Sequence, residues 1–445
     1  MPSFPALMQR RTVRRRMNTP RLGDNPSFVP TLQHFDPMSS AAPILAGLQI
    51  IELSAFVAAP SCGLALAQLG ADVIRVDPPG GNIDIGRLPL APSGRSIYWA
   101  SLNRGKRSVE IDCRKPEGQR LVREMLKNGG RDGGILLTNL PLSGGLAEAA
   151  IREARPNAIV VQLTGSPDGR NALDYTVNCA VGFPFLTGDG RAPVNHVLPA
   201  WDAVAGLTLA TGILAAERRR RETGLGQFVK LTLADVAMAM TMNLGLTGEV
   251  EVNGTERKAD GNFLYGAYGD VFLTADQRHV MVVAISDRQW QALVRATGLE
   301  TAIAGAAAAL GMQLDNEAGR FEARELISAC LRPWFAKRTA AAIEAAFTDR
   351  SLLWGLYRTV AQMVTEDARF SAANPMCKRV RHPEVGEYLT AASPLTFDGA
   401  PRVAPAAGPV LGEHTLTTLR ELAGVSEADA ARLASAGIIG RGAKR

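Results

Sequence analysis

A chain of 445 residues, 46% hydrophobic and 21% charged, is long enough to bury a complete core and typical in length of two or three domains. The net charge is +6, but residues 1–40 hold six arginines against two aspartates, so the rest of the chain gives no electrostatic indication of nucleic-acid binding. Five widely spaced cysteines, without a Cys-x-x-Cys pair or a histidine at ligand spacing, predict reduced thiols in a cytoplasmic protein and no metal site.

Residues 1–40 are rich in arginine and proline and lack the apolar segment of a secretion signal, so we expect a disordered extension outside the fold. Two alternatives stay open. The segment is poor in acids, as organelle transit peptides are, and the true start could also be Met38. The longest apolar run, residues 203–216, is too short to span a bilayer and contains two threonines and two glycines, so no membrane role is expected.

From residue 45 to residue 250, short apolar strands alternate with helical patterns. This alternation implies parallel strand pairing and a large three-layer α/β domain. The predicted strands are Gln49–Leu53, Val73–Val76, Ser108–Ile111, Ile135–Leu137 and Ile159–Leu163, and the predicted helices are Pro60–Leu69, Pro116–Lys127 and Trp201–Arg221. The last helix ends in four arginines, residues 218–221, followed by Gly224. We interpret the arginines first as a solvated helix end and only second as a phosphate site.

Residues 260–390 are expected to form a smaller α+β domain. Gly266–Val283 alternates like a β-hairpin with a polar turn at residues 274–278. Helical patterns follow at Asp287–Thr297, Phe321–Lys337 and Thr339–Phe347. The Pro- and Gly-rich residues 393–412 predict a connecting strap, followed by a helix at Thr415–Ala423 and a tail, so that residues 393–445 return to the large domain.

The turn between the first predicted strand and the helix that follows it shows whether the chain has a dinucleotide-binding unit. A dinucleotide fingerprint needs glycines there, so that the backbone can approach a pyrophosphate. Residues 54–60 contain none, which disfavours an NAD-linked oxidoreductase. The chain also contains no Gly-x-x-x-x-Gly-Lys-Ser/Thr loop and no Gly-x-Ser-x-Gly elbow.

Asp202 stands where a polar loop runs into the long apolar helix. The N–H groups and the dipole at a helix start are expected to hold this carboxylate ionised, and they could stabilise an oxyanion forming beside it. Asp202 is therefore a candidate nucleophile. The alternative is that it only caps or charge-balances the helix.

Five blocks of the sequence resemble the family III CoA-transferases, from about Leu45 to His414. No block is specific by itself, and the resemblance depends on their order and spacing. The blocks are residues 48–53, 66–76, 103–108, 223–227 and 411–415. The resemblance implies a large α/β domain with a small inserted domain, and a homodimer of interlocked chains. It also implies an acyl-CoA substrate, with no cofactor beyond the CoA of that substrate and no metal.

In that family, a single aspartate at the start of the helix before the Thr-Gly-x-Gly-Gln block attacks the thioester, and the matching residue is Asp202. The resemblance implies a mixed anhydride, then an aspartyl-CoA thioester, then resolution by an acceptor carboxylate. Such covalent steps conserve the energy of the thioester. The implied contacts with CoA fall on Val57, Ala58, Ile111, Arg114 and Asn139, with Lys106 and Arg107 as further candidates for its phosphates.

Two departures from the family pattern narrow the activity. The acyl-CoA racemases of the family have a His-Asp pair where this chain has Leu173-Asp174, so the base for proton transfer is missing at that position. Asp174 is retained as a residue that could orient the site, although a loop aspartate can simply begin a turn. The glycine run that covers the intermediate in formyl-CoA transferases is also replaced, by residues 260–266.

Four segments resemble one branch of this family in their detailed sequence, namely residues 54–60, 174–178, 194–202 and 261–267. The enzymes of that branch move CoA between the two carboxyl groups of one unsaturated five-carbon diacid. Holding such a dianion needs a cation or hydrogen-bond donors, and the candidates are His196 and Arg170. The alternatives are intermolecular CoA transfer, racemisation, and a non-catalytic protein that binds CoA esters.

Overall fold

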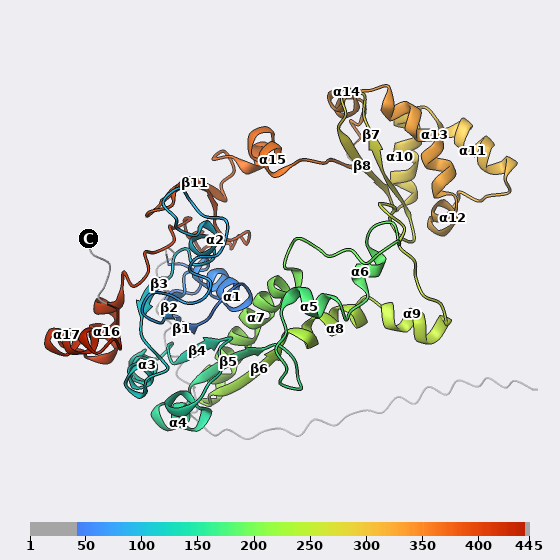
Figure 1. Ribbon diagram of the computed structural model, residues 1–445. Coiled ribbons are helices and arrows are strands. Elements are labelled where there is room, and N and C mark those ends of the chain that lie inside the picture. Colours follow the sequence, from blue (N-terminus) through green and yellow to red (C-terminus); the bar gives the residue numbers. More distant parts are fainter. Residues whose placement is uncertain (1–41, 350, 441–445) are drawn as a thin grey trace, which may run out of the picture. The chain divides into compact units, whose positions relative to one another are not determined.

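The computed structural model describes residues 42–349 and 351–440, so the predicted N-terminal extension and Met38 lie outside the described residues. Six parallel strands form the main sheet, in the order β3-β2-β1-β4-β5-β6 (Figure 1). Their bounds are β1 Gln49–Leu53, β2 Asp72–Asp77, β3 Arg107–Glu110, β4 Ile135–Thr138, β5 Ile159–Thr164 and β6 Gln227–Thr232.

The inner strands of this sheet, such as β4 and β5, are apolar on both faces because helices cover both sides of the sheet. Ile50 and Ile51 are neighbours in β1 and point into two different hydrophobic clusters, one on each face. The strand β6 was not predicted. It lies at the edge of the sheet and its residues are only partly buried, so its sequence, Gln-Phe-Val-Lys-Leu-Thr, lacks the apolar run of the inner strands.

Helices pack on the two faces to give three layers. The cluster on one face includes residues of α1 (Ala58–Ala67), α7 (Ala200–Thr223) and α8 (Leu233–Asn243). The cluster on the other face includes residues of α3 (Pro116–Asn128), α4 (Glu148–Ala154), α16 (Thr415–Ala423) and α17 (Glu427–Ser435). The predicted fold class, a three-layer α/β domain with a parallel sheet, is confirmed.

The long helix α7 ends as its sequence predicts, with Gly224 in the left-handed conformation (φ 75°) and its N–H donated to the carbonyl of Arg220. The interpretation of all four terminal arginines as a solvated end was wrong for Arg220. Its side chain is buried and donates to the carbonyl oxygens of Gly133 and Asn157. The guanidinium therefore joins the helix end to the loops beside β4 and β5.

A close contact between helices fixes the start of α7. A Cβ atom at Gly206 would lie 2.1 Å from the Ser61 hydroxyl oxygen and 2.8 Å from the Ala58 carbonyl oxygen, so only glycine fits there. The contact brings α7 against the first turn of α1. Asp202 lies one helical turn before Gly206, and its distance from the loop that follows β1 is set by this packing.

A second, antiparallel sheet has the order β7-β8-β9, with β7 Tyr268–Leu273, β8 His279–Ala284 and β9 Leu353–Leu356. The predicted hairpin is present as β7 and β8. The predicted helix Phe321–Lys337 is instead two helices separated at Ala323, and β9 was not predicted. The helices around this sheet are α10 Asp287–Thr297, α11 Glu300–Ala309, α12 Glu317–Glu322, α13 Arg324–Ala336 and α14 Ala340–Ala346.

The remaining segments are short. A two-stranded antiparallel ribbon, β10 with β11, precedes the predicted strap, and residues 401–410 of that strap contain neither helix nor strand. The other elements are α2 Ile97–Leu102, η1 Gly144–Leu146, α5 Asp174–Asn178, α6 Phe183–Leu186, α9 Leu246–Asn253, α15 Val360–Glu366, η2 Ala368–Phe370, β10 Cys377–His382 and β11 Gly386–Ala391. In the described part of the chain, no helix combines the length and apolar character needed to cross a bilayer.

Candidate active site

The carboxyl edge of the parallel sheet gathers the candidate residues. Helix α1 follows β1, and α7 connects β5 to β6, so both helices begin at this edge. Parallel α/β sheets bind ligands outside the carboxyl ends of their strands. Asp202, in the first turn of α7, therefore lies on the same edge as the loops that follow β1, β3 and β4.

Asp174 organises the start of α7. One of its carboxylate oxygens, Oδ2, accepts the backbone N–H of Trp201 at 2.7 Å and that of Asp202 at 3.1 Å. Asp174 is itself buried at the start of α5. The expectation that these N–H groups would serve an oxyanion beside Asp202 was wrong for these two groups, because Asp174 already occupies them.

The imidazole of His196 binds the other oxygen of Asp174, with Nε2 2.6 Å from Oδ1, and its ring contacts Tyr175 edge-on. The sequence places no histidine beside Asp174, yet a loop 22 residues later supplies one. Leu173, by contrast, is exposed. Two of the three predicted substrate residues, Asp174 and His196, thus come together beside Asp202.

The third predicted substrate residue, Arg170, is separate. Its guanidinium is exposed and pairs with Asp168 through Nε and Oδ2 at 2.6 Å, within one loop. The structure gives it the ordinary role of a surface ion pair, which contributes little energy.

The Asp202 carboxyl is easier to protonate than an ordinary aspartate. Burial, followed by the negative charge of Asp174, raises its pKa to about 6, and the positive charge of Arg87 acts in the opposite direction. The helix start was expected to hold this carboxylate ionised, but burial and the charge of Asp174 favour its protonated form. A carboxylate with this pKa is mostly ionised at neutral pH, and it is more basic than a solvated aspartate.

The raised pKa predicts how activity and stability vary with pH. Attack on a thioester requires the ionised Asp202, so kcat/KM should fall below a pKa of about 6, by ~10-fold per pH unit. The contribution to folding has the opposite sign. Because the folded-state pKa is raised, this group stabilises the fold most at low pH, and that stabilisation is lost as the pH rises through about 6. A pH–rate profile measures the first effect.

Asp174→Asn should move the acidic limb of that profile to lower pH, since it removes the like charge that raises the Asp202 pKa. Asp168→Asn, at the exposed pair with Arg170, is the matched control and should leave the limb in place. A profile that stays flat through pH 6 would contradict the assignment of Asp202.

A cavity of about 520 Å³ lies at the same edge of the sheet, between the strand ends and the loops that follow β3 and β4. Ile111 and Arg114, two of the predicted CoA contacts, line it. Asn139 follows the cavity residue Thr138, and its side chain exchanges two hydrogen bonds with the backbone of Ala55, at 2.9 and 2.8 Å. These bonds join the loop after β4 to the loop after β1.

The other predicted CoA contacts lie in different environments. Val57 is the residue before α1, and Ala58, its first residue, is buried. Arg114 is exposed and paired with Asp112, with Nε 2.7 Å from Oδ1. Because Arg114 lines the cavity, its contact with a CoA phosphate stays a prediction.

Lys106 and Arg107 do not lie where a phosphate could bind. Lys106 is buried, and its amine donates to Glu52, to the Pro60 carbonyl and to Asn103, which uses all three protons. Arg107 begins β3, so it lies at the amino edge of the sheet, where it pairs with Asp72 and Glu421. We therefore remove both from the set of candidate CoA contacts.

A buried charge network supports the loop after β1. Arg75, fully buried, donates to Asp77, Asp84, Asn103 and the Ser54 carbonyl. Asp84 in turn accepts the N–H of Phe56 at 3.0 Å. The network extends from the interior of the sheet to the backbone of the candidate active site.

Arg87, Phe56 and Tyr98 are site residues that sequence reasoning missed. The charge of Arg87 lowers the pKa of Asp202 and that of Tyr98, whereas burial raises both, and the guanidinium lies over the rings of Phe56 and Tyr98. Two of these residues lie in irregular segments and the third in the six-residue helix α2, where no periodic pattern predicts the direction of a side chain. The single available signal was an arginine in a segment otherwise poor in charge.

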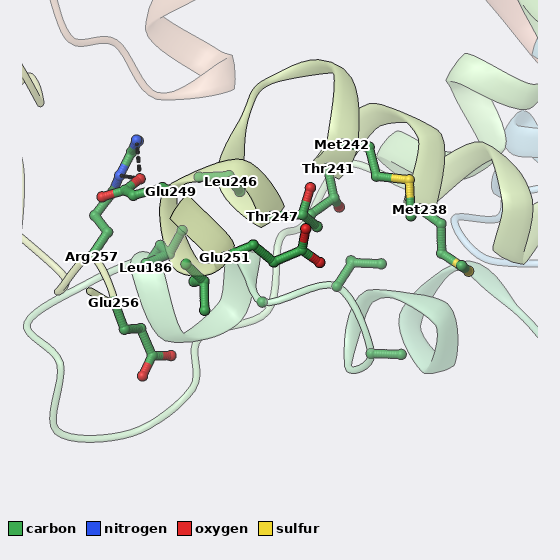
Figure 2. A pocket seen from close by; sticks show the side chains of 14 residues that line it. Leu186, Met238, Thr241, Met242, Leu246, Thr247, Glu249, Glu251, Glu256 and Arg257 are labelled. Atoms are coloured by element: carbon green, nitrogen blue, oxygen red, sulfur yellow. Dashed lines mark hydrogen bonds and ion pairs between the residues drawn. The ribbon is translucent and has the colours of Figure 1, made fainter. Parts of the chain in front are cut away.

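Figure 2 shows a different cavity, lined by α8, α9 and the loop before α6, with Met238, Met242 and Leu246 among its apolar residues. Glu249 and Arg257 form an ion pair there at 2.6 Å. None of the residues predicted to bind CoA or substrate lines it. In the described ranges, no group of three or more histidine, cysteine or acidic side chains could hold a metal ion, and the five cysteines are free.

A parallel α/β sheet with a partly buried carboxyl of raised pKa and a cavity at the same ligand-binding edge fits an enzyme with a carboxylate nucleophile. The chain matches the model of CoA-transferase family III over residues 45–415. It belongs to that family, and the resemblance stated from the sequence blocks is confirmed.

Two curated relatives cover almost the whole chain. The 2-methylfumaryl-CoA isomerase of Chloroflexus aurantiacus is 48% identical over 399 residues, which is 89% of this chain and 98% of that protein. The succinyl-CoA–D-citramalate CoA-transferase of the same organism is 28% identical over 90% of this chain and all of that protein. Among solved structures, a CAIB/BAIF family protein from Brucella suis is 25% identical, with a TM-score of 0.71 over 86% of this chain and all of that one.

Proposed function

We propose that this protein is an enzyme that moves CoA from one carboxyl group to the other of a single unsaturated diacid, converting 2-methylfumaryl-CoA to 3-methylfumaryl-CoA. The observation that carries the proposal is the placement of Asp202, an ionisable carboxyl at the ligand-binding edge of the sheet, with its backbone fixed by Asp174. The 48% identity to a 2-methylfumaryl-CoA isomerase supports the substrate.

The first half of the reaction loads CoA onto Asp202. A carboxylate oxygen of Asp202 attacks the thioester carbonyl and the C–S bond breaks. The thiolate of CoA is released, and a mixed anhydride forms between Asp202 and the acyl group. The thiolate then attacks the aspartyl carbonyl of the anhydride. The C–O bond between the aspartyl carbonyl and the diacid breaks, so the diacid is freed from the anhydride as a dianion and Asp202 becomes a CoA thioester.

The second half reverses these steps with the other carboxyl group. That carboxylate attacks the aspartyl thioester, expels the thiolate and forms a second anhydride. Attack of the thiolate on the substrate carbonyl then gives the isomeric thioester and restores Asp202. No net proton transfer is needed, but water must be excluded because it would hydrolyse both the anhydride and the thioester.

We further propose that the released diacid, mesaconate, stays bound and turns end for end before it reacts again. The same proposal includes a homodimer in the cytoplasm. Intermolecular transfer to a different acid is the second candidate, and the 28% identity to a CoA-transferase with two separate substrates favours it over racemisation. The retained diacid distinguishes the two candidates, since intermolecular transfer requires it to leave.

The test is to incubate the purified protein with 2-methylfumaryl-CoA alone and to follow by NMR which carboxyl group carries CoA. We expect conversion to the isomer without any added acid. Labelled free mesaconate added in excess should enter the product far more slowly than the isomer forms. Equal incorporation would contradict retention, and no conversion without an added acid would favour intermolecular transfer.

A further inference from the structure

The loop between β2 and α2 holds Arg87 against two aromatic rings. Its guanidinium carbon lies 5.7 Å from the ring centre of Phe56 and 5.2 Å from that of Tyr98. A guanidinium that stacks on aromatic rings keeps its N–H donors along its edge, in the geometry that matches a carboxylate. The two rings therefore restrict the orientation of the cation and leave most of its five N–H donors for a ligand.

The two rings are themselves held in place. Phe56 has a left-handed backbone (φ 65°), which is costly for a large side chain, and the hydrogen bond from its N–H to Asp84 helps to keep it there. Tyr98 lies in the first turn of α2. The cap of that helix, Ser96, accepts the N–H of Trp99 and donates its hydroxyl to the carbonyl of Arg87. Strain of this kind concentrates at binding sites.

Arg87 has no acidic partner among the described residues. The arginines on either side of it in the sequence both have one, since Arg75 pairs with Asp84 and Arg95 with Glu384. Phe56, which Arg87 covers, lies two residues before α1, and the first turn of α1 packs against α7 at Gly206, one turn after Asp202. This packing brings Arg87 to the side of α7 that carries Asp202, in agreement with the lowering of the Asp202 pKa by the charge of Arg87. An oriented and unpaired guanidinium beside the nucleophile is a binding site for an anion.

We propose that Arg87, held between Phe56 and Tyr98, binds the carboxylate of the substrate that does not carry CoA, while the other carboxyl group reacts at Asp202. The inference rests on the proposed function, because only a dicarboxylate substrate has this second group. Neither of the other candidates is as well placed: His196 is bound to Asp174, and Arg170 is on the surface with Asp168.

The position of Arg87 also explains how the diacid is retained. Asp202 carries a negative charge before reaction and none as an anhydride or thioester. When CoA is loaded on Asp202, the field of Arg87 is no longer offset by that charge, and the free diacid has two carboxylates. Arg87 therefore attracts the diacid most strongly at the stage where its escape would end the isomerisation.

The test compares two substrates that differ only at the proposed contact. Tigloyl-CoA has a methyl group where 2-methylfumaryl-CoA has its free carboxylate. The measurement is the rate at which each one loads CoA onto Asp202, followed by the intact mass of the protein. At about pH 8, where Asp202 stays ionised with or without the charge of Arg87, the wild type should load from the diacid roughly 100-fold faster. Under the same conditions Arg87→Gln should remove that preference by slowing the diacid and leaving tigloyl-CoA unchanged. Arg87→Lys should restore part of it.

The control is Arg95→Gln, which removes an exposed arginine paired with Glu384 and should change neither rate. If Arg87→Gln slows both substrates equally, the residue supports the structure only and the proposal fails. It fails also if the preference for the diacid survives. If the wild type loads CoA from neither substrate, the proposed function itself is wrong, a result distinct from both.

Discussion

Replacing Asp202 by alanine should abolish isomerisation, with kcat lower by on the order of 10⁴-fold or more, because no other group can form the acyl and CoA intermediates. The fold should persist, since the side chain of Asp202 makes no hydrogen bond that holds α7. The cap of that helix comes from Asp174, which accepts the backbone N–H groups of Trp201 and Asp202 whatever the side chain at position 202. The measurement is product formation by NMR.

Loading of CoA should disappear together with turnover. The wild type, stopped during reaction, should carry CoA on the peptide that contains Asp202, and Asp202→Ala should carry none. Asp189→Asn is a suitable control, because Asp189 is an exposed acid paired with Arg191 outside the site. Retention of more than about a hundredth of the wild-type kcat by Asp202→Ala would exclude a covalent role for this residue.

Arg75→Met should destabilise the protein by about 3–5 kcal/mol, a loss large enough to leave much of it unfolded under mild denaturing conditions. Arg75 is fully buried, and its removal leaves Asp77 and Asp84 as buried acids without their counter-ion. Burial already raises the pKa of Asp77 even with Arg75 present. The measurement is the midpoint of urea unfolding.

The control is Arg218→Met, at a solvent-exposed pair with Glu222, which should cost about 0–1 kcal/mol. Because Asp84 holds Phe56, the Arg75 variant should also lose activity when assayed at a temperature at which it is still folded. If Arg75→Met unfolds at the same urea concentration as the wild type, the network does not stabilise the fold as described.

Much of the parallel sheet could be predicted because its strands are buried on both faces. An inner strand such as Ile159–Thr164 has an apolar run that needs no tertiary information to recognise. The edge strand β6 and the ribbon of β10 and β11 lack that run. Residues such as Arg379 and Arg381 are exposed, and strands of this kind form because a partner strand is available.

Asp202 was found from a local feature, the start of a long helix, together with the resemblance to the family. The groups around it come from distant parts of the chain, so no spacing reveals them. His196 binds Asp174, which lies 22 residues earlier in the sequence, and Lys106 is buried and donates to Glu52, 54 residues earlier. A lysine near a strand is usually solvated, and because the sequence does not show its partner Glu52, Lys106 was included among the candidate phosphate ligands.

The last helices of the chain complete a surface that forms at its beginning. The N–H of Glu110 in β3 is satisfied by the hydroxyl of Thr415, 305 residues later, and Leu419 and Leu433 lie in the same apolar cluster as β1 and β2. During synthesis at ~5–20 residues per second, that face of the sheet waits on the order of tens of seconds for its cover. A nascent chain leaving the ribosome therefore exposes the part of this face that α16 and α17 cover until those helices have been made, and chaperones have that interval in which to act.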